Sequence, residues 1–235
     1  MKKLFIVLAI LIFVQSANAQ LFNKERLANI ENFDQKKISW GYFLGYNSFD
    51  YKFKYREDNP DENVDVQVTG EGGFNVGLIG DVRISDYINI RLEPGLSFTK
   101  RNLVFPGFEE EKDYLREVKS TYIHIPLLVK VSTKRLNNFK PFVVGGFSTS
   151  FNLSSNEEHP EDNASGQFRS ISNSLNYELG FGIDFYLFFF KFTPSIRGVF
   201  SLSDELVRDA NSNSPWTGNI ESMSSRGMFI NFTFQ

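Results

Sequence analysis

Apolar and polar residues alternate with a period of two along much of the chain. The clearest run is 88–99, where Ile88 and Leu92 fall on one side and Arg91 and Glu93 fall on the other. This period is typical of a β-strand with one apolar face, and a one-residue slip in pairing would exchange the two faces. Seven further segments alternate in the same way, with varying clarity: 40–46, 74–83, 121–131, 141–152, 175–186, 190–202 and 228–234. The pattern therefore predicts an all-β protein with eight strands.

Eight such strands suit either a soluble sandwich or a closed barrel in a membrane, and the polar face decides between them. It carries glycines, such as Gly41, Gly77 and Gly180, beside isolated charges, whereas the apolar face is nearly free of charge. A sandwich has no need of small residues on a face turned to water, but the narrow interior of an eight-stranded barrel does. A charge-free outer face is what lipid requires. We therefore expect an eight-stranded antiparallel transmembrane β-barrel whose lumen is filled by side chains.

The predicted connections between strands alternate between short and long. The joins near 84–87, 132–140 and 186–189 are short. The long, polar joins are 48–73, 100–120, 153–173 and 203–224. Outer-membrane barrels have short periplasmic turns and longer outer loops, so this alternation agrees with a barrel that has both chain ends in the periplasm.

The first part of the chain predicts export. Two lysines, an apolar core over 4–14 and an A-x-A motif over 17–19 are typical of a secretory signal peptide, which we expect to be cleaved from residues 1–19. Apolar residues recur at helical spacing in 20–37, so this periplasmic segment is either a short helix or lid, or a loosely ordered leader. Residues 38–235 form the expected outer-membrane barrel.

Four prolines, Pro94, Pro126, Pro141 and Pro194, fall inside predicted strands. Proline removes a hydrogen-bond donor from the ladder and is rare away from sheet edges. Because a closed barrel has no edge, we expect these prolines at bulges or strand ends.

Composition argues against most chemistry. The 235 residues carry a formal charge of −3, which does not favour nucleic-acid binding, and no cysteine is available for a thiolate site or a disulfide. The two histidines, His124 and His159, are far apart in the sequence, and neither a nucleophile elbow nor an H-E-x-x-H motif occurs. We therefore expect no enzyme activity, no cofactor and no small-molecule substrate.

Two acidic loops have spacings that resemble the start of a calcium-binding loop. Asp61, Asn63 and Asp65 form the first, and Asp209, Asn211 and Asn213 form the second. Both lack the glycine at position six and the closing glutamate that such loops require. We interpret both as solvated loops.

The predicted lumen face carries the chain's one concentrated set of polar side chains. Paired charges of both signs would fill a small barrel without leaving a pore, and buried charges must find partners. The alternative is a path for protons or ions. The set consists of Asp81, Arg83, Arg91, Glu93, His124, Lys130, Glu178, Asp184, Lys191 and Arg197.

Long stretches of the chain resemble the PorT family, an outer-membrane β-barrel component of the type IX secretion system. The stretches that carry the resemblance are 32–55, 74–105, 116–146, 181–207 and 214–223. The opening SWGYFLGYNSFDYKFKY and the loop SPWTGNI are the most particular of them, whereas IPLLVK and PFVVGG are shared with many porin-like barrels.

The resemblance implies a non-enzymatic role in protein secretion and, in gliding bacteria, in surface motility. Its implied partners are outer-membrane lipid and other type IX secretion components, together with the barrel-insertion machinery, which reads the aromatic terminal strand FINFTFQ. The loops 48–73 and 203–224 are the leading contact regions, and Trp216 is either a partner anchor or an aromatic residue at the membrane boundary. A generic anchoring barrel and an outer-membrane enzyme are the competing hypotheses.

Overall fold

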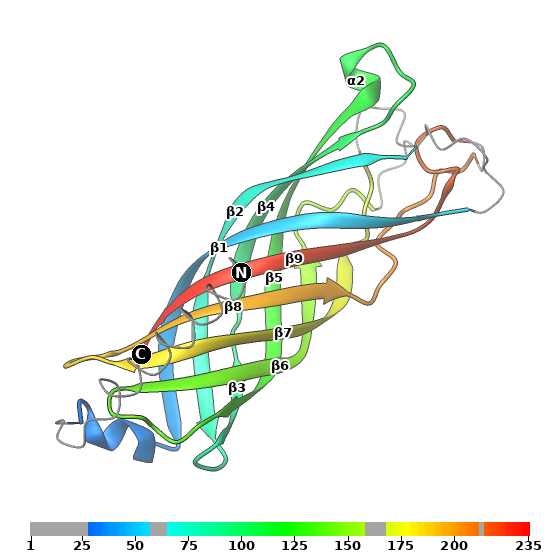
Figure 1. Cartoon of the computed structure of the whole chain (residues 1–235). Coiled ribbons are helices and arrows are strands. Elements are labelled where there is room, and N and C mark those ends of the chain that lie inside the picture. Colours follow the sequence, from blue (N-terminus) through cyan, green and yellow to red (C-terminus); the bar gives the residue numbers. More distant parts are fainter. Residues whose placement is uncertain (1–27, 57–64, 158–167, 212–213) are drawn as a thin grey trace, which may run out of the picture.

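The computed structural model describes residues 28–56, 65–157, 168–211 and 214–235. Long antiparallel strands wind into a tilted barrel, and two single helical turns, η1 (Glu31–Gln35) and α2 (Glu111–Tyr114), lie near its opposite ends (Figure 1). The strands are β1 (Ile38–Tyr55), β2 (Gln67–Arg83), β3 (Ile88–Leu92), β4 (Gly95–Val104), β5 (Leu115–Ser132), β6 (Phe139–Asn152), β7 (Asn173–Tyr186), β8 (Lys191–Ser201) and β9 (Ile220–Phe234). None of the helices in these described residues is long and apolar enough to cross a membrane.

The strands close into a ring of eight. Each pairs antiparallel with its neighbours in sequence, and β1 completes the ring by pairing with both β2 and β9. β3 and β4 act as one barrel strand, because both pair with β2 on one side and with β5 on the other. The register with β5 is continuous, whereas the register with β2 shifts once, between Glu71 and Phe74. The predicted all-β, eight-stranded antiparallel barrel is confirmed.

The two faces of the barrel wall follow the predicted alternation. Outward side chains are apolar and open to the surroundings, as at Trp40, Leu179 and Phe181, which are 73%, 66% and 60% exposed. Inward side chains at the same level are polar and buried, as at Asn75 and Asp81. The strand register inferred from the sequence is therefore right at this level of the barrel.

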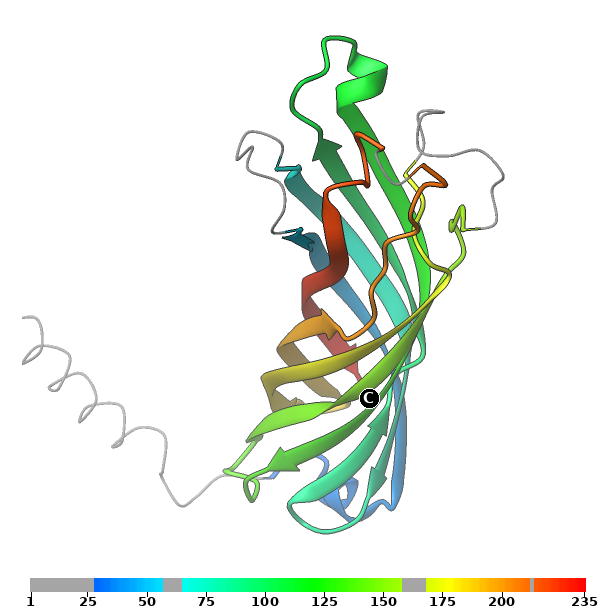
Figure 2. The same cartoon turned by 90° about the vertical axis from the view of Figure 1, so that its right-hand side faces the viewer.

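Five strands are longer than the sequence pattern indicated. The segment β1–β2–β4–β5–β9 continues beyond the apolar band as an outer extension, which we define as 48–55, 67–72, 99–104, 115–121 and 220–227. Figure 2 shows the β4–β5 hairpin, with α2 at its tip, reaching farthest. The expected loops 48–73, 100–120 and 203–224 are therefore partly strand.

The physical reason is that the alternation changes its sense in the outer extension. The outward positions become polar, as at Asp50, Lys52 and Lys54. Apolar side chains such as Tyr51 now point inward, together with the buried Arg101 and Arg116. A search for apolar outward faces therefore stops at Tyr46. Apolar side chains of these strands and of the adjoining connections form one buried cluster: Tyr51, Val66, Leu103, Phe105, Val118, Phe168, Leu206, Ile220 and Met223.

Two of the four prolines lie where they were expected and two do not. Pro94 separates β3 from β4, and Pro141 lies close to the start of β6. Pro126 and Pro194 lie inside β5 and β8 without any shift of register, so a bulge or strand end is wrong for both. Pro126 is tolerated because it faces the interruption between β3 and β4, where its carbonyl accepts from the Glu93 N–H at 3.3 Å. Beside Pro194 the backbone pairing between β7 and β8 is interrupted and then resumes in the same register.

The connections predicted to be short are formed by local turns. The hydroxyl of Ser85 accepts hydrogen bonds from the N–H groups of Tyr87 and Ile88 in the β2–β3 turn, and Asn137 adopts a left-handed conformation (φ 54°) in the β5–β6 turn. The segment before β1 contains only one turn of 3-10 helix, η1, among its described residues. The expected signal peptide and its cleavage site lie outside the described residues.

Candidate functional site

A continuous ladder of ion pairs crosses the lumen at the level of the apolar band. Arg91 holds the Asp81 carboxylate with two hydrogen bonds, of 2.8 and 2.9 Å, and reaches Glu93 at 3.3 Å. Arg197 bridges the other Glu93 oxygen and Glu178, both at 2.7 Å. All five side chains are almost completely buried. Bidentate and bridging guanidinium groups of this kind hold carboxylates in fixed positions.

His124 ends this ladder on the side nearer the outer extension. Its Nε2 lies 2.7 Å from a Glu178 oxygen and its Nδ1 lies 2.8 Å from the Ser150 hydroxyl. The edge of Phe229 packs against the imidazole ring, with 5.4 Å between ring centres. Both ring nitrogens are thus engaged, which agrees with the interpretation of His124 as a hydrogen-bonded lumen residue.

A second group of charges lies nearer the end of the barrel that carries the short connections β2–β3, β5–β6 and β7–β8, here called the short-turn end. Lys130 pairs with Asp184 at 2.6 Å and stands over the ring of Phe142, and the Thr193 hydroxyl donates to the other Asp184 oxygen at 2.7 Å. The amine of Lys191 lies 4.6 Å from the centre of the Phe33 ring. Strands that are distant in the sequence therefore contribute to one packed interior.

The charges of this interior balance. Four acids (Asp81, Glu93, Glu178 and Asp184) and four bases (Arg91, Lys130, Lys191 and Arg197) are buried there, which gives a formal sum of zero when His124 is neutral. Spaces beside the ladder measure about 20 Å³ and about 30 Å³. A cavity of that size holds on the order of one or two water molecules. The lumen is a core of paired charges.

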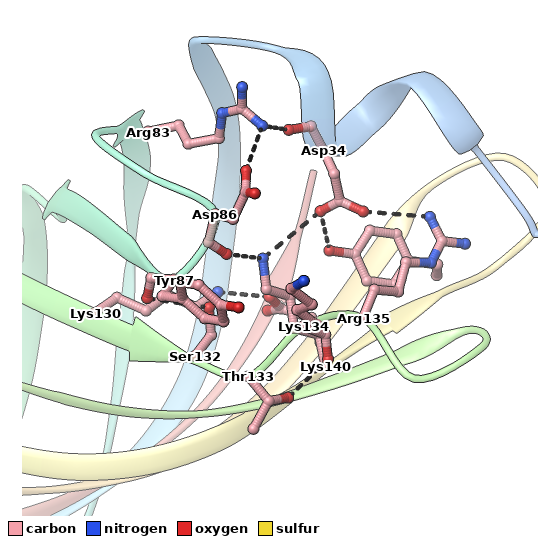
Figure 3. A network of polar contacts seen from close by, with 12 residues as sticks. Asp34, Arg83, Asp86, Tyr87, Lys130, Ser132, Thr133, Lys134, Arg135 and Lys140 are labelled. Atoms are coloured by element: carbon pink, nitrogen blue, oxygen red, sulfur yellow. Dashed lines mark hydrogen bonds and ion pairs between the residues drawn. The ribbon is translucent and has the colours of Figure 1, made fainter. Parts of the chain in front are cut away.

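Arg83, the tenth residue of the predicted lumen set, does not join the ladder. It lies half-buried at the short-turn end, 3.6 Å from Asp86, and donates to the main-chain oxygen of Asp34 in η1. Figure 3 shows this arrangement. Residue parity fixes the face of a strand but not the height of the residue in the barrel, so the sequence pattern did not show that Arg83 lies apart from the ladder.

The segment before β1 closes the short-turn end of the lumen, which agrees with the lid considered for 20–37. The Tyr186 hydroxyl donates to Asp34 at 2.6 Å, and Arg135 and Lys140 lie 3.4 and 3.8 Å from the same carboxylate (Figure 3). Phe33 meets the Tyr186 ring edge-on, with 6.1 Å between ring centres. These contacts join residues more than 100 positions apart.

At the opposite end, Trp216 is partly buried. Its ring stacks on Phe108, with 5.4 Å between centres and 1° between planes, and its indole N–H donates to the Asp113 carbonyl at 3.3 Å. The side chain also packs against the apolar cluster of the outer extension. Trp216 thus ties the loop before β9 to the β4–β5 hairpin, and a role in partner binding stays a prediction.

The described residues contain no group of three or more acidic or imidazole side chains placed to hold a metal ion. In the second calcium-like loop, the Asp209 carboxylate instead accepts from Ser214 and Thr217, at 2.5 and 3.0 Å, and pairs with Arg169 at 3.2 Å. In the first loop, Asp61 and Asn63 lie outside the described residues, as do Asn213 and His159.

Comparison with protein families decides the class of the chain. The model of the outer membrane protein beta-barrel domain family matches residues 18–207. The chain belongs to this family. It is therefore a small β-barrel protein of the bacterial outer membrane, and its apolar outer face lies in lipid.

Solved structures of small outer-membrane barrels resemble the chain only distantly. OprG from Pseudomonas aeruginosa is 13% identical, with 84% of this chain and 93% of OprG covered and a TM-score of 0.44. AlkL in lipid bilayers is 11% identical, with 91% and 94% covered and a TM-score of 0.43. The attachment invasion locus protein Ail of Yersinia pestis is 12% identical, with 85% and 98% covered and a TM-score of 0.36. A search of curated proteins finds no match.

Proposed function

We propose that the protein is a non-enzymatic accessory barrel of protein secretion by the type IX system, and that it acts through contacts with other secretion components. The observation that carries this proposal is the filled, charge-paired lumen. An eight-stranded barrel is only wide enough for side chains to fill it, so a secreted protein cannot pass through it. Function then resides on the outside of the barrel: its rims, its loops and its outer extension.

The resemblance to PorT supports the assignment to this secretion system. The most particular stretch, SWGYFLGYNSFDYKFKY, coincides with 39–55, almost the whole of β1. The second, SPWTGNI at 214–220, leads into β9, the partner of β1. These stretches adjoin the β1–β9 seam, and both reach into the outer extension.

Deletion of the gene in a bacterium with a type IX system tests the role. We expect the whole class of type IX cargo to disappear from the culture fluid and to return when the wild-type gene is supplied on a plasmid. An envelope defect with intact secretion would contradict the proposal and favour a generic anchoring barrel. Affinity purification from outer membranes under mild detergent should in parallel recover other secretion components.

The contact at Trp216 can be tested against the chain's second tryptophan, Trp40. We expect Trp216→Ala to reduce secretion and the recovery of partners, whereas Trp40→Ala, on the lipid face, should change neither. Because Trp216 also packs against Phe108, the heat-dependent gel mobility of each variant must show that the barrel itself is intact. Unchanged secretion and unchanged recovery of partners would remove Trp216 from the interface.

Planar-bilayer recording on the purified protein tests directly whether the lumen is filled. The paired lumen should give no large, stable conductance. Such a conductance in the wild-type protein would refute the filled lumen and, with it, the argument that function resides on the outside of the barrel.

A further inference from the structure

Arg101 is a buried cation that the ladder does not include. It projects from β4 into the lumen where the ladder gives way to the apolar cluster, and it is 1% exposed. Its guanidinium carbon lies 4.1 Å from the centre of the Tyr51 ring and 5.2 Å from that of Phe49. No hydrogen bond of good geometry joins its three nitrogens to the described part of the chain, although the Tyr122 hydroxyl and the Glu205 carboxylate lie near enough to act on its charge.

This arrangement is incomplete as it stands. A guanidinium group carries five N–H donors and no acceptor, and aromatic faces attract its charge without accepting those donors in the plane of the group. An unpaired charge and unmet donors are both costly in a buried site. An acceptor from outside the chain is therefore needed to complete the site.

The guanidinium lines a cavity that has room for such an acceptor. The cavity measures about 20 Å³, enough for one or two water molecules or for a single halide ion. Hydroxyl groups line it. Those of Ser225 and Ser150 are engaged by Glu205 and His124, and those of Ser97 and Ser174 can donate to an anion. Its polar lining consists of Ser97, Arg101, Tyr122, His124, Ser150, Ser174, Asn176, Glu205 and Ser225.

The one acid in the lining, Glu205, is held by other groups. Its two carboxylate oxygens accept from the N–H and the hydroxyl of Ser225, at 3.3 and 2.7 Å. The Glu205 charge still favours the charged guanidinium, but the carboxylate forms no hydrogen bond with the Arg101 nitrogens. His124 is likewise engaged, by Glu178 and Ser150. The guanidinium is therefore the only charged group of the lining whose polar atoms all lack a partner in the described residues.

We propose that this cavity binds a small monovalent anion, with a halide as the simplest case, held by the Arg101 guanidinium and the surrounding serine hydroxyls. The anion completes the charge pairing that the ladder begins. It does so at the boundary between the polar lumen and the apolar cluster, where no carboxylate of the ladder reaches.

Crystals of the wild-type barrel soaked in sodium bromide test the site without any variant. We expect an anomalous bromide peak within hydrogen-bonding distance of the Arg101 nitrogens. A site filled only by water, with no anomalous signal, would overturn the proposal. So would a bromide bound elsewhere in the lumen but absent from this cavity.

Unfolding in urea and detergent gives a second measurement. For one site, a tenfold rise in chloride well above its dissociation constant should raise the folded-to-unfolded ratio about tenfold, while sodium gluconate, whose anion is too large, serves as the ionic-strength control. Arg101→Met should abolish the difference between the two salts, and Arg226→Met, on the outer surface, should preserve it. Equal responses to chloride and gluconate in the wild type, or a chloride response that persists in Arg101→Met, would contradict the proposal.

Discussion

The barrel has two sections that are stabilised in opposite ways. At the level of the lipid, the interior is a set of ion pairs such as Arg91–Asp81, and the exterior is apolar. In the outer extension, the interior is an apolar cluster around Leu103 and Met223, and the exterior carries exposed ion pairs such as Asp50–Arg226 at 2.6 Å. The same strands run through both sections, so the surroundings decide which face is polar.

The difference shows where each section obtains its stability. In the lipid section, apolar side chains gain nothing from turning inward, because lipid is as apolar as a core, and the buried charges must compensate one another. In the outer extension, water surrounds the strands, and burial of apolar surface stabilises them as it does in a soluble protein. The exposed ion pairs there contribute little.

Breaking the ladder of ion pairs should lower the free energy of unfolding the most. Arg91→Met leaves Asp81 and Glu93 without their shared partner, and the loss of one member of a buried ion-pair group costs about 3–5 kcal/mol. The measurement is the free energy of unfolding in urea and detergent. Arg226→Met removes a guanidinium from an exposed pair and should change that energy very little. Equal effects of the two variants would show that the lumen charges are solvated.

Removing one side chain from the apolar cluster should lower the free energy of unfolding slightly less than breaking the ladder does. Leu103→Ala deletes a completely buried side chain in the outer extension, and leucine-to-alanine changes in cores cost about 2–5 kcal/mol. Val104→Ala, on the outward face of the same strand, is the matched control and should have a small effect. If Leu103→Ala proved as mild as its control, the outer extension would lack the packed core described here.

A charge introduced on the outward face should destabilise the lipid section but not the outer extension. Leu179→Arg places a guanidinium on the lipid side near the middle of β7, where the expected cost is about 2–4 kcal/mol. Ser224→Arg places it on the outward face of the outer extension and should be tolerated. Similar losses from both would place the membrane boundary beyond the extension, and the same urea titration distinguishes these outcomes.

The sequence predicted the lipid section well and the outer extension poorly. Apolar outward residues at every second position are a direct signature of lipid contact, so the register around Leu92 and Leu179 could be read from the chain alone. Beyond Tyr46 the alternation persists but changes its sense, and residues such as Arg101 were assigned to loops. Only pairing between strands, which the one-dimensional pattern does not contain, shows that the ring continues there.

The candidate site, too, could be predicted from the sequence only in part. The side of the strand that Asp81, Glu178 and Arg197 occupy follows from residue parity, so the inward set could be predicted. Which charges pair depends on the stagger of neighbouring strands, and a partner such as Arg91 for Asp81 appears only in three dimensions. A lid before β1 could be considered from its helical spacing, but the partners of the Asp34 carboxylate lie more than 100 residues away and have no local signal.

The smallest expected effect concerns this closure of the short-turn end. Tyr186→Phe removes the hydroxyl that donates to Asp34 at 2.6 Å but keeps the ring that meets Phe33. Arg135 and Lys140 still face the carboxylate, so the loss should be about 1 kcal/mol and confined to the segment before β1. That corresponds to roughly fivefold more frequent opening of the segment.

Hydrogen exchange followed by mass spectrometry can detect this local change. Exchange in the peptide covering 28–37 should accelerate about fivefold in Tyr186→Phe, while exchange in β7 itself stays unchanged, because local opening does not require the barrel to unfold. Tyr177→Phe, on the lipid face of the same strand, should leave the segment as it is in the wild type. Acceleration throughout β7 would mean that Tyr186 supports the barrel and not its closure. No acceleration in 28–37 would mean that the ion pairs of Asp34 hold the segment without the hydroxyl.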